Sequence, residues 1–260
     1  MEYSMSLVIK NLSFSYKHHR VLQDISFDAA PGDIITIIGP NGSGKTTCIK
    51  CLAGLAKPAC GSIELDAQNI YAMSDHERAL TIAYVPQRSD VCGISVFDLL
   101  LLGRHPYISW GIPEADLLRA GHIIEYMGLK DLAFRQTDAI SGGEFQIAQI
   151  ARAIIQDPKL IALDEATSNL DIQNQQKVML KIRALVRSKK IIAVMTSHDI
   201  NLSIRYSDKF VFLKDGRVYA SGSNKIITSQ TIRAVYGIDV HVETINGFPV
   251  VIPKGEEAIP

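Results

Sequence analysis

One segment near the N-terminus constrains the fold more than any other. Residues 33–52 read DIITIIGPNGSGKTTCIKCL, where a run of β-branched residues, Ile34 to Ile38, meets a glycine-rich loop. The run has the length of a buried strand, and a helical pattern resumes at Thr47. A strand, a glycine loop and a helix in this order are typical of an α/β unit in a parallel sheet. We therefore expect an α/β fold with a ligand site at the carboxyl end of this strand.

The loop itself has the residues of a phosphate-binding loop. Gly39, Gly44, Lys45 and Thr46 fit the pattern GxxxxGK[ST] without mismatch. The glycines allow backbone N–H groups to point inward around phosphates at a helix N-terminus. Lys45 should reach the β- and γ-phosphates, and the Thr46 hydroxyl should hold Mg²⁺. The alternative is a strand-to-helix turn with no ligand, but the lysine and threonine favour a nucleotide site.

A second apolar strand ends in two acidic residues. LIALDE runs from Leu160 to Glu165, and a strand that is apolar on both faces belongs in the centre of a parallel sheet. Asp164 and Glu165 then lie beyond its carboxyl end, where ligands of such sheets bind. An Asp-Glu pair after a strand is otherwise a common start of a solvated loop. Beside a phosphate loop, Asp164 is predicted to help hold Mg²⁺ and Glu165 to polarise the attacking water.

Two further polar residues follow apolar strands. His198 comes after the strand in KIIAVMTSHDI and could hydrogen-bond a γ-phosphate at the same sheet edge. A lone histidine is more often an ordinary surface or core residue. Gln87 ends TIAYVPQ, and in isolation it indicates little.

The segment ISGGEFQ, residues 140–146, raises a separate question. Ser141 and Glu144 have the spacing of a capping box at a helix start. Gly142 and Gly143 stand between them, although each glycine in a helical turn costs roughly 1 kcal/mol relative to alanine. A flexible loop that meets a cap explains the pair. A ligand that approaches the backbone closely, as anions do at helix N-termini, explains it equally well.

The composition is that of an ordinary globular protein and excludes several classes. Lys plus Arg and Asp plus Glu both number 27, so no broad basic field indicates nucleic-acid binding. The N-terminal segment lacks the layout of a signal peptide, and no apolar run approaches the ~18 residues of a membrane span. We expect a cytosolic chain that can still sit against a membrane protein. Cys48 and Cys51 fall in an apolar helical stretch and are predicted to be buried.

Taken together, these segments resemble the ATP-binding subunits of ATP-binding-cassette (ABC) transporters over essentially the whole chain. GPNGSGKTT resembles the family's Walker A motif, ISGGE its signature motif and LIALDE its Walker B motif. Gln87 falls at the Q-loop, SNLD (168–171) at the D-loop and His198 at the switch histidine. Tyr16, which alone would be only a strand aromatic, falls where the family stacks a ring on adenine.

The resemblance implies ATP and Mg²⁺ as cofactors and a head-to-tail homodimer. In such a dimer each nucleotide lies between one chain's phosphate loop and the other chain's signature motif. Glu165, His198 and Gln87 are then the catalytic residues, and Thr46, Gln87 and Asp164 are the metal-binding residues. The implied nucleotide-binding residues are Tyr16, Gly39, Pro40, Asn41, Gly42, Ser43, Gly44, Lys45, Thr46, Thr47, Ser141, Gly142 and Gly143.

The chain departs from the family pattern in small ways. Ile140 replaces a common leucine, Phe145 stands where a polar or basic residue is frequent, and Ala166 replaces a frequent proline. None of these changes removes a phosphate, metal or water contact, so only local packing is affected.

The expected fold is a P-loop NTPase core with a mainly parallel sheet, an antiparallel β subdomain and an inserted helical subdomain. We predict an ABC ATP-binding domain over residues 5–242, with the helical subdomain and signature motif at 88–157, and a C-terminal tail at 243–260. KFVFLKDGRVYASG predicts a hairpin that turns at Asp215 and Gly216.

Two segments narrow the resemblance. LLLGRHPY (100–107) and VYGIDVHVETINGFPVVIP (235–253) are similar to importer subunits for iron–siderophore, haem or cobalamin uptake. This resemblance implies an ATPase paired with itself and with two integral-membrane permease subunits at the cytoplasmic face of the membrane. A substrate-binding protein would take part indirectly. A permease coupling helix is expected on the surface around Gln87 to Trp110, with Arg104 exposed there; ordinary packing of a helical subdomain also explains many of its leucines.

Other ABC classes remain as alternatives. A soluble ABC ATPase without a transporter, such as an iron–sulfur assembly ATPase, would carry the same nucleotide motifs. ABC proteins of DNA repair or chromosome maintenance place long coiled coils between the two motif sets, and the sequence has none. A simple P-loop kinase would lack SGGE.

Overall fold

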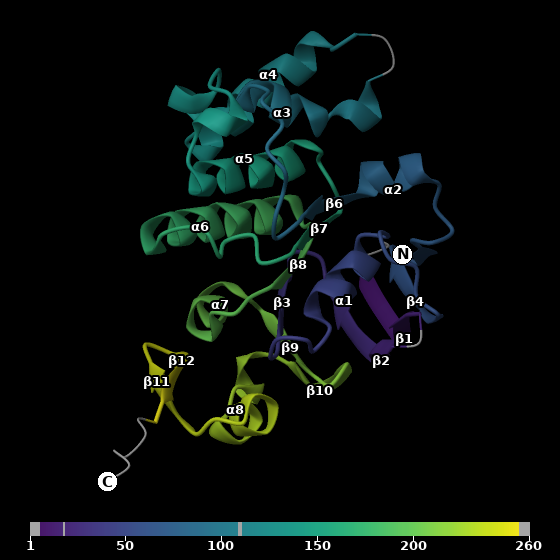
Figure 1. The fold of residues 1–260 in the computed structure, drawn as a ribbon, viewed down its shortest axis with the longest axis vertical. Helices are drawn as coiled ribbons and strands as arrows, with labels where there is room; N and C mark the ends of the chain where they lie inside the picture. Colours follow the sequence, from purple (N-terminus) through teal and green to yellow (C-terminus); the bar gives the residue numbers. More distant parts are fainter. Residues whose placement is uncertain (1–5, 18, 109–110, 255–260) are drawn as a thin grey trace.

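A six-stranded, mainly parallel sheet forms the centre of the computed structural model, which describes residues 6–17, 19–108 and 111–254 (Figure 1). The strand order is β10-β9-β3-β8-β7-β6, and only β9 and β10 pair antiparallel, around the predicted turn at Asp215 and Gly216. The strands are β3 (Ile34–Ile38), β6 (Ile82–Val85), β7 (Leu160–Leu163), β8 (Ile192–Thr196), β9 (Lys209–Lys214) and β10 (Arg217–Gly222). The four inner strands are apolar on both faces because layers cover both sides.

An antiparallel sheet and one helix cover the first face. The sheet has the order β2-β1-β4-β5, and helix α1 lies between it and the central sheet. Its strands are β1 (Leu7–Tyr16), β2 (His19–Ala29), β4 (Cys60–Leu65) and β5 (Gln68–Asn69), with α1 at Lys45–Leu52 and α2 at Asp75–Thr81. Cys48 and Cys51 of α1 are fully buried in this core, which confirms that they pack as small apolar residues.

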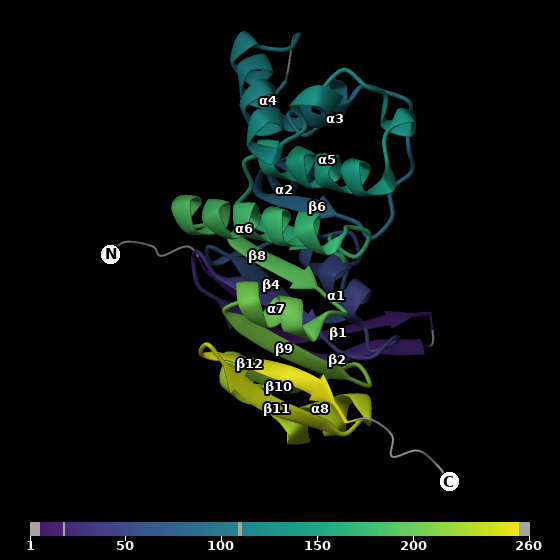
Figure 2. The same cartoon turned by 90° about the vertical axis from the view of Figure 1, so that its left-hand side faces the viewer.

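A helical subdomain lies beyond α6 (Ile172–Lys189), which covers the opposite face of the sheet (Figure 2). It consists of α3 (Val96–Leu102), α4 (Glu114–Met127) and α5 (Gly142–Ile155), with short 3₁₀ turns η1 (His105–Tyr107), η2 (Lys130–Leu132) and η3 (Thr137–Ala139). Phe145, Ala148, Ile154 and Ile155 of α5 are all buried, as the apolar pattern of that helix predicts. One core cluster runs from these helices through α6 to the sheet.

The C-terminal elements pack on a third, smaller core beneath the phosphate loop. They are α7 (Ile200–Tyr206), η4 (Asn224–Ile226), α8 (Ser229–Tyr236), β11 (Val240–Ile245) and β12 (Phe248–Pro253). Ile38, the last residue of β3, joins this core, so the end of the chain supports the start of the loop. The predicted division between residues 242 and 243 falls inside β11, and residues 5 and 255–260 lie outside the described residues.

These elements confirm the predicted fold class. The parallel core, the antiparallel sheet and the inserted helices are all present. Within the described residues, none of the helices combines the length and the apolar character needed to cross a membrane.

Candidate functional site

The phosphate loop joins β3 to α1, and two of its glycines, Gly39 and Gly44, are required by the protein's own fold. A Cβ at Gly39 would lie 2.2 Å from the Leu213 carbonyl oxygen. Gly44 has φ +101°, and a Cβ there would lie 2.6 Å from the Leu22 side chain. An L side chain fits neither position without strain, because the first lacks space and the second lacks a favourable backbone conformation.

Lys45 is folded into its own loop. Its Nζ donates hydrogen bonds to the carbonyl oxygens of Gly39 (2.8 Å) and Pro40 (3.1 Å), and the residue is only 6% exposed. Burial lowers the pKa of Lys45, while the nearby Glu165 and Asp164 oppose the shift. The Ser43 hydroxyl is buried without a hydrogen-bond partner. A buried cation and an unpaired donor in a glycine cradle fit the oxygens of a phosphate chain.

Asp164 follows β7 and is fixed by two threonines. Its Oδ1 accepts hydrogen bonds from Thr46 (3.2 Å) and Thr196 (2.8 Å). Burial raises the pKa of Asp164, and the two threonine hydrogen bonds work against that rise. A carboxylate and a hydroxyl oxygen are the hard ligands that Mg²⁺ prefers. No group of three or more His, Cys, Asp or Glu side chains within the described ranges is placed to hold a metal.

Glu165 lies at the meeting point of three strand ends. It is 8% exposed and has φ +49°, a conformation that is uncommon outside glycine and concentrates at functional sites. Its carboxylate accepts a hydrogen bond from Gln87 Nε2, beyond β6, and lies 2.5 Å from His198 Nε2, beyond β8. Its backbone N–H donates to the Thr196 hydroxyl at 2.9 Å. The structure therefore brings together Gln87, Glu165 and His198, although the first and last were weak signals in the sequence.

A cleft of about 390 Å³ joins these groups to the phosphate loop. It is lined by Val21, Asn41, Gly42, Gly44, Lys45, Thr46, Thr47, Gln87, Glu165 and His198. Val21 and the supporting Thr196 were not predicted. Thr196 is the last residue of a buried strand, and a hydroxyl at that position was the only signal available. Tyr16 lies at the end of β1, is half exposed and packs edge-on against Phe14, outside this lining.

The signature segment lies apart from this cleft, at the start of α5. Ser141 Oγ accepts a hydrogen bond from the Glu144 N–H (3.3 Å), and the Ser141 N–H donates to the Glu144 carboxylate (2.8 Å), which confirms the capping box. A Cβ at Gly142 would meet nothing within 4 Å. At Gly143 it would make only ordinary contacts of 3.5 Å with Asn169 and Leu170. The chain's own packing therefore does not explain these two glycines.

The prediction that Arg104 is exposed was wrong. Arg104 is 7% exposed and pairs with the buried Asp116 at 2.8 Å. Its guanidinium also donates to the Ile155 carbonyl oxygen and lies 3.7 Å from the centre of the Tyr107 ring. The side chain turns inward because this carboxylate, carbonyl and ring together satisfy a buried guanidinium.

Comparisons with known proteins point to one family. The family model for ABC transporters matches residues 22–168. An ABC transporter ATP-binding protein of Methanocaldococcus jannaschii is 41% identical over 96% of this chain and 99% of its own length. A petrobactin import ATP-binding protein of Bacillus anthracis is 33% identical over 96% of this chain and 94% of its own. A cobalamin import ATP-binding protein of Halobacterium salinarum is 31% identical over 92% of this chain and 61% of its own.

Solved structures show the same relationship. An inward-facing transporter described as metal-chelate type has a TM-score of 0.83 and 30% identity, covering 97% of this chain and 98% of that one. A dimeric ATP-binding cassette in a post-hydrolysis state with ADP and phosphate has a TM-score of 0.75 and 26% identity, covering 84% and 98%. The chain thus belongs to the ABC transporter family and is an ABC-type ATPase that binds and hydrolyses ATP.

Proposed function

We propose that this ATPase powers the import of a metal chelate, such as an iron–siderophore or haem, or of cobalamin. The relatives named for petrobactin and cobalamin import, and the structure described as metal-chelate type, support this cargo class. The comparisons do not favour the alternative of a soluble ATPase outside a transporter. The ATPase would work at the cytoplasmic face of the membrane with two permease subunits, and a substrate-binding protein would deliver the cargo to them.

The cleft supports a division of labour around MgATP. Lys45 and the loop N–H groups would hold the phosphates, and Thr46 and Asp164, with Gln87, would hold Mg²⁺. Mg²⁺ would neutralise charge that develops on the phosphates during hydrolysis. Glu165 would orient and deprotonate the attacking water, and His198, within reach of Glu165, would contact the γ-phosphate. Tyr16 is exposed enough at the end of β1 to stack on the adenine ring.

The signature segment is proposed to complete the site of a second copy in a head-to-tail dimer. Ser141 and Gly142 are exposed, and the bare backbone at the start of α5 offers N–H groups at the positive end of a helix. Dimeric structures of related cassettes support this arrangement. The signature motif is absent from the cleft lining of its own chain, so a partner's nucleotide is the ligand that fits it.

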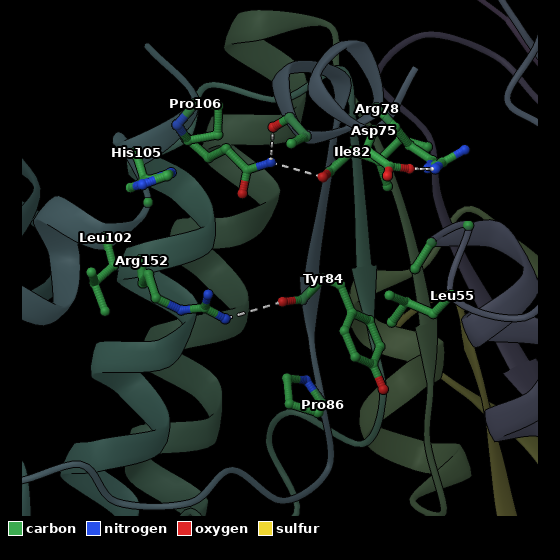
Figure 3. Close-up of a pocket in the computed structure, with 15 residues that line it drawn as sticks. Leu55, Asp75, Arg78, Ile82, Tyr84, Pro86, Leu102, His105, Pro106 and Arg152 are labelled. Atoms are coloured by element: carbon green, nitrogen blue, oxygen red, sulfur yellow. Dashed lines mark hydrogen bonds and ion pairs between the residues drawn. The ribbon is translucent and has the colours of Figure 1, made fainter. Parts of the chain in front are cut away.

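A groove of about 670 Å³ between the helical subdomain and the core is proposed to receive a permease helix (Figure 3). In Figure 3, Leu102, His105 and Arg152 face Leu55 and Tyr84 across it. Leu102 and Leu55, one on each wall, are 51% and 63% exposed, and exposed apolar side chains gathered at one groove fit a protein-binding surface. The groove only partly coincides with the surface predicted around Gln87 to Trp110. Of the residues that line it, Leu102, Gly103, His105 and Pro106 fall in that range, and Trp110 lies outside the described residues.

The observation that carries the ATPase part of this proposal is that Lys45, Gln87, Glu165 and His198 line one cleft.

The permease contact is tested by Leu102→Glu, with Leu118→Glu as a matched control. Leu118 is similarly exposed, at 59%, but lies on α4 outside the groove. Leu102→Glu should weaken co-purification with co-expressed permease subunits and leave basal ATPase unchanged. Equal co-purification of both variants would remove the groove from the interface.

A further inference from the structure

The position of His198 depends on a short helix that cannot hold itself in place. His198 lies between Thr196, the end of β8, and Asp199, which caps α7 by accepting a hydrogen bond from the Leu202 N–H at 2.8 Å. Helix α7 has only seven residues, and isolated helices shorter than about 12–15 residues are marginal in water. Tertiary contacts must therefore fix its orientation, and with it the loop that carries the histidine.

The C-terminal hairpin β11–β12 supplies part of those contacts, while β3 and α6 also touch α7. The side-chain amide of Asn201 donates to the Val251 carbonyl oxygen (3.0 Å) and accepts from the Val251 N–H (2.9 Å). Both backbone polar groups of Val251, in β12, are thus hydrogen-bonded to α7. The Arg205 guanidinium lies 4.7 Å from the centre of the Phe248 ring, within cation–π range. Ile204 packs with Val251 in the third core. Figures 1 and 2 both show β12 beside α7.

Neither the nucleotide cleft nor the permease groove uses these contacts. The residues that line the cleft include none from α7, β11 or β12, and the same holds for the groove. The Asn201 bonds require a side chain that donates and accepts at once, as an amide does. A merely apolar docking of the hairpin would not require that geometry.

We infer that the β11–β12 hairpin is a positioning element for His198, and that Asn201 is the residue through which it acts. The hairpin holds α7, α7 holds the loop at residues 197–199, and the loop holds the imidazole against Glu165. The inference rests on the role proposed for His198 in hydrolysis. It assigns the C-terminal hairpin to the rate of ATP turnover, with no part in nucleotide binding.

A double-mutant cycle tests this inference on the full-length chain. Asn201→Ala should lower kcat about tenfold at saturating ATP, within the ~10²-fold cost of misplacing a catalytic group by 1 Å. The ATP affinity of the dilute chain should stay unchanged. In the His198→Ala background, residual hydrolysis should fall no further when Asn201→Ala is added, because residues that act through one group are not additive.

A matched control and a second probe support the cycle. Asn69→Ala also removes an asparagine–backbone hydrogen bond, to the Tyr71 N–H at 2.9 Å, but lies in β5 away from α7. It should leave kcat unchanged in both backgrounds. Phe248→Ala removes the ring beside Arg205 and should repeat the Asn201→Ala pattern more weakly. It replaces Asn201→Ala in the cycle if Asn201→Ala folds poorly.

The outcomes distinguish a failure of this inference from a failure of the role proposed for His198. If His198→Ala leaves kcat unchanged, the role proposed for His198 fails and this inference fails with it. If His198→Ala lowers kcat but Asn201→Ala lowers it by the same factor in both backgrounds, the hairpin acts by general destabilisation and the inference alone is overturned. An unchanged kcat in both Asn201→Ala and Phe248→Ala also overturns it.

Discussion

The two glycine-rich segments of this ATPase differ in why they contain glycine. In the phosphate loop, Gly39 has no space for a side chain and Gly44 has a left-handed backbone. In the signature segment, Gly142 faces open space and Gly143 has only ordinary neighbours. Both segments begin a helix, α1 and α5, and both would present N–H groups to an anion. The fold of the chain itself therefore requires glycine at positions 39 and 44, whereas it does not require glycine at 142 and 143.

This difference indicates where each segment finds its ligand. The phosphate loop lies in a cleft with Glu165 and His198, so we propose that the same chain binds its ligand. In the signature segment, Ser141 and Glu144 form the capping box of α5. The two glycines between them have no side chains, although the packing of their own chain would allow them. We interpret glycines that the fold does not need as room for a ligand that approaches the backbone closely. In the proposed dimer, this ligand is the nucleotide bound by the partner.

The largest effect is expected at Glu165, the proposed catalytic base of the cleft. Glu165→Gln should lower kcat by ~10²–10⁴, the usual contribution of a positioned acid–base group. ATP affinity should persist, because Lys45 and Asp164 remain. The ATP-loaded dimer should then accumulate and appear as an increase in size on gel filtration. Near-normal hydrolysis would show that another group activates the water, and the cleft would lose its central role.

Binding by the single chain should depend on Lys45. A hydrogen bond to a charged group contributes ~1.5–3 kcal/mol, so Lys45→Ala should weaken ATP binding by a dilute chain roughly ten- to a hundredfold. Lys57→Ala, at an exposed position after the end of the same helix α1, provides a charge-matched control. Titration of a fluorescent ATP analogue measures both. Equal affinities for the two variants would place the phosphates away from the loop.

The smallest effect concerns stability without nucleotide and compares the two kinds of glycine directly. Gly44→Ala should destabilise the chain by about 1–3 kcal/mol, the cost of a strained backbone position. Gly142→Ala should be neutral or stabilise by up to about 1 kcal/mol, because alanine is the better helix former. Urea unfolding of both variants measures the difference. A destabilised Gly142→Ala would mean that the fold needs this glycine after all.

Local patterns in the sequence predicted most of the fold and the centre of the cleft. Strand residues such as Ile34 to Ile38 are apolar on both faces, so their burial in a parallel sheet could be read directly. The phosphate loop and the Asp164–Glu165 pair follow such strands, and the sheet edge brings them together. The Asp-Gly turn at residues 215 and 216 predicted the β9–β10 hairpin, and helical periodicity predicted the buried stripe of α5.

Features that depend on distant partners were not predictable. Arg104 looks like a surface cation until the buried Asp116 and the Ile155 carbonyl are seen beside it. Thr196 is one threonine at a strand end, and its two hydrogen bonds to the acidic pair appear only when β7 and β8 are adjacent. Asn201 meets Val251 across fifty residues of chain. Such side chains carry no periodic signal, because their partners are set by tertiary structure.

The shared site is the central claim, and the affinity of Ser141→Arg for ATP in a dilute chain tests it most directly. The fluorescent ATP analogue is titrated at protein concentrations below the dimer range, beside wild type and Lys45→Ala. The account predicts near wild-type affinity, with ATP-driven dimerisation and hydrolysis abolished because a bulky side chain enters the closing interface. If Ser141→Arg instead loses monomer affinity as severely as Lys45→Ala, the serine contacts its own chain's nucleotide and the shared site is contradicted.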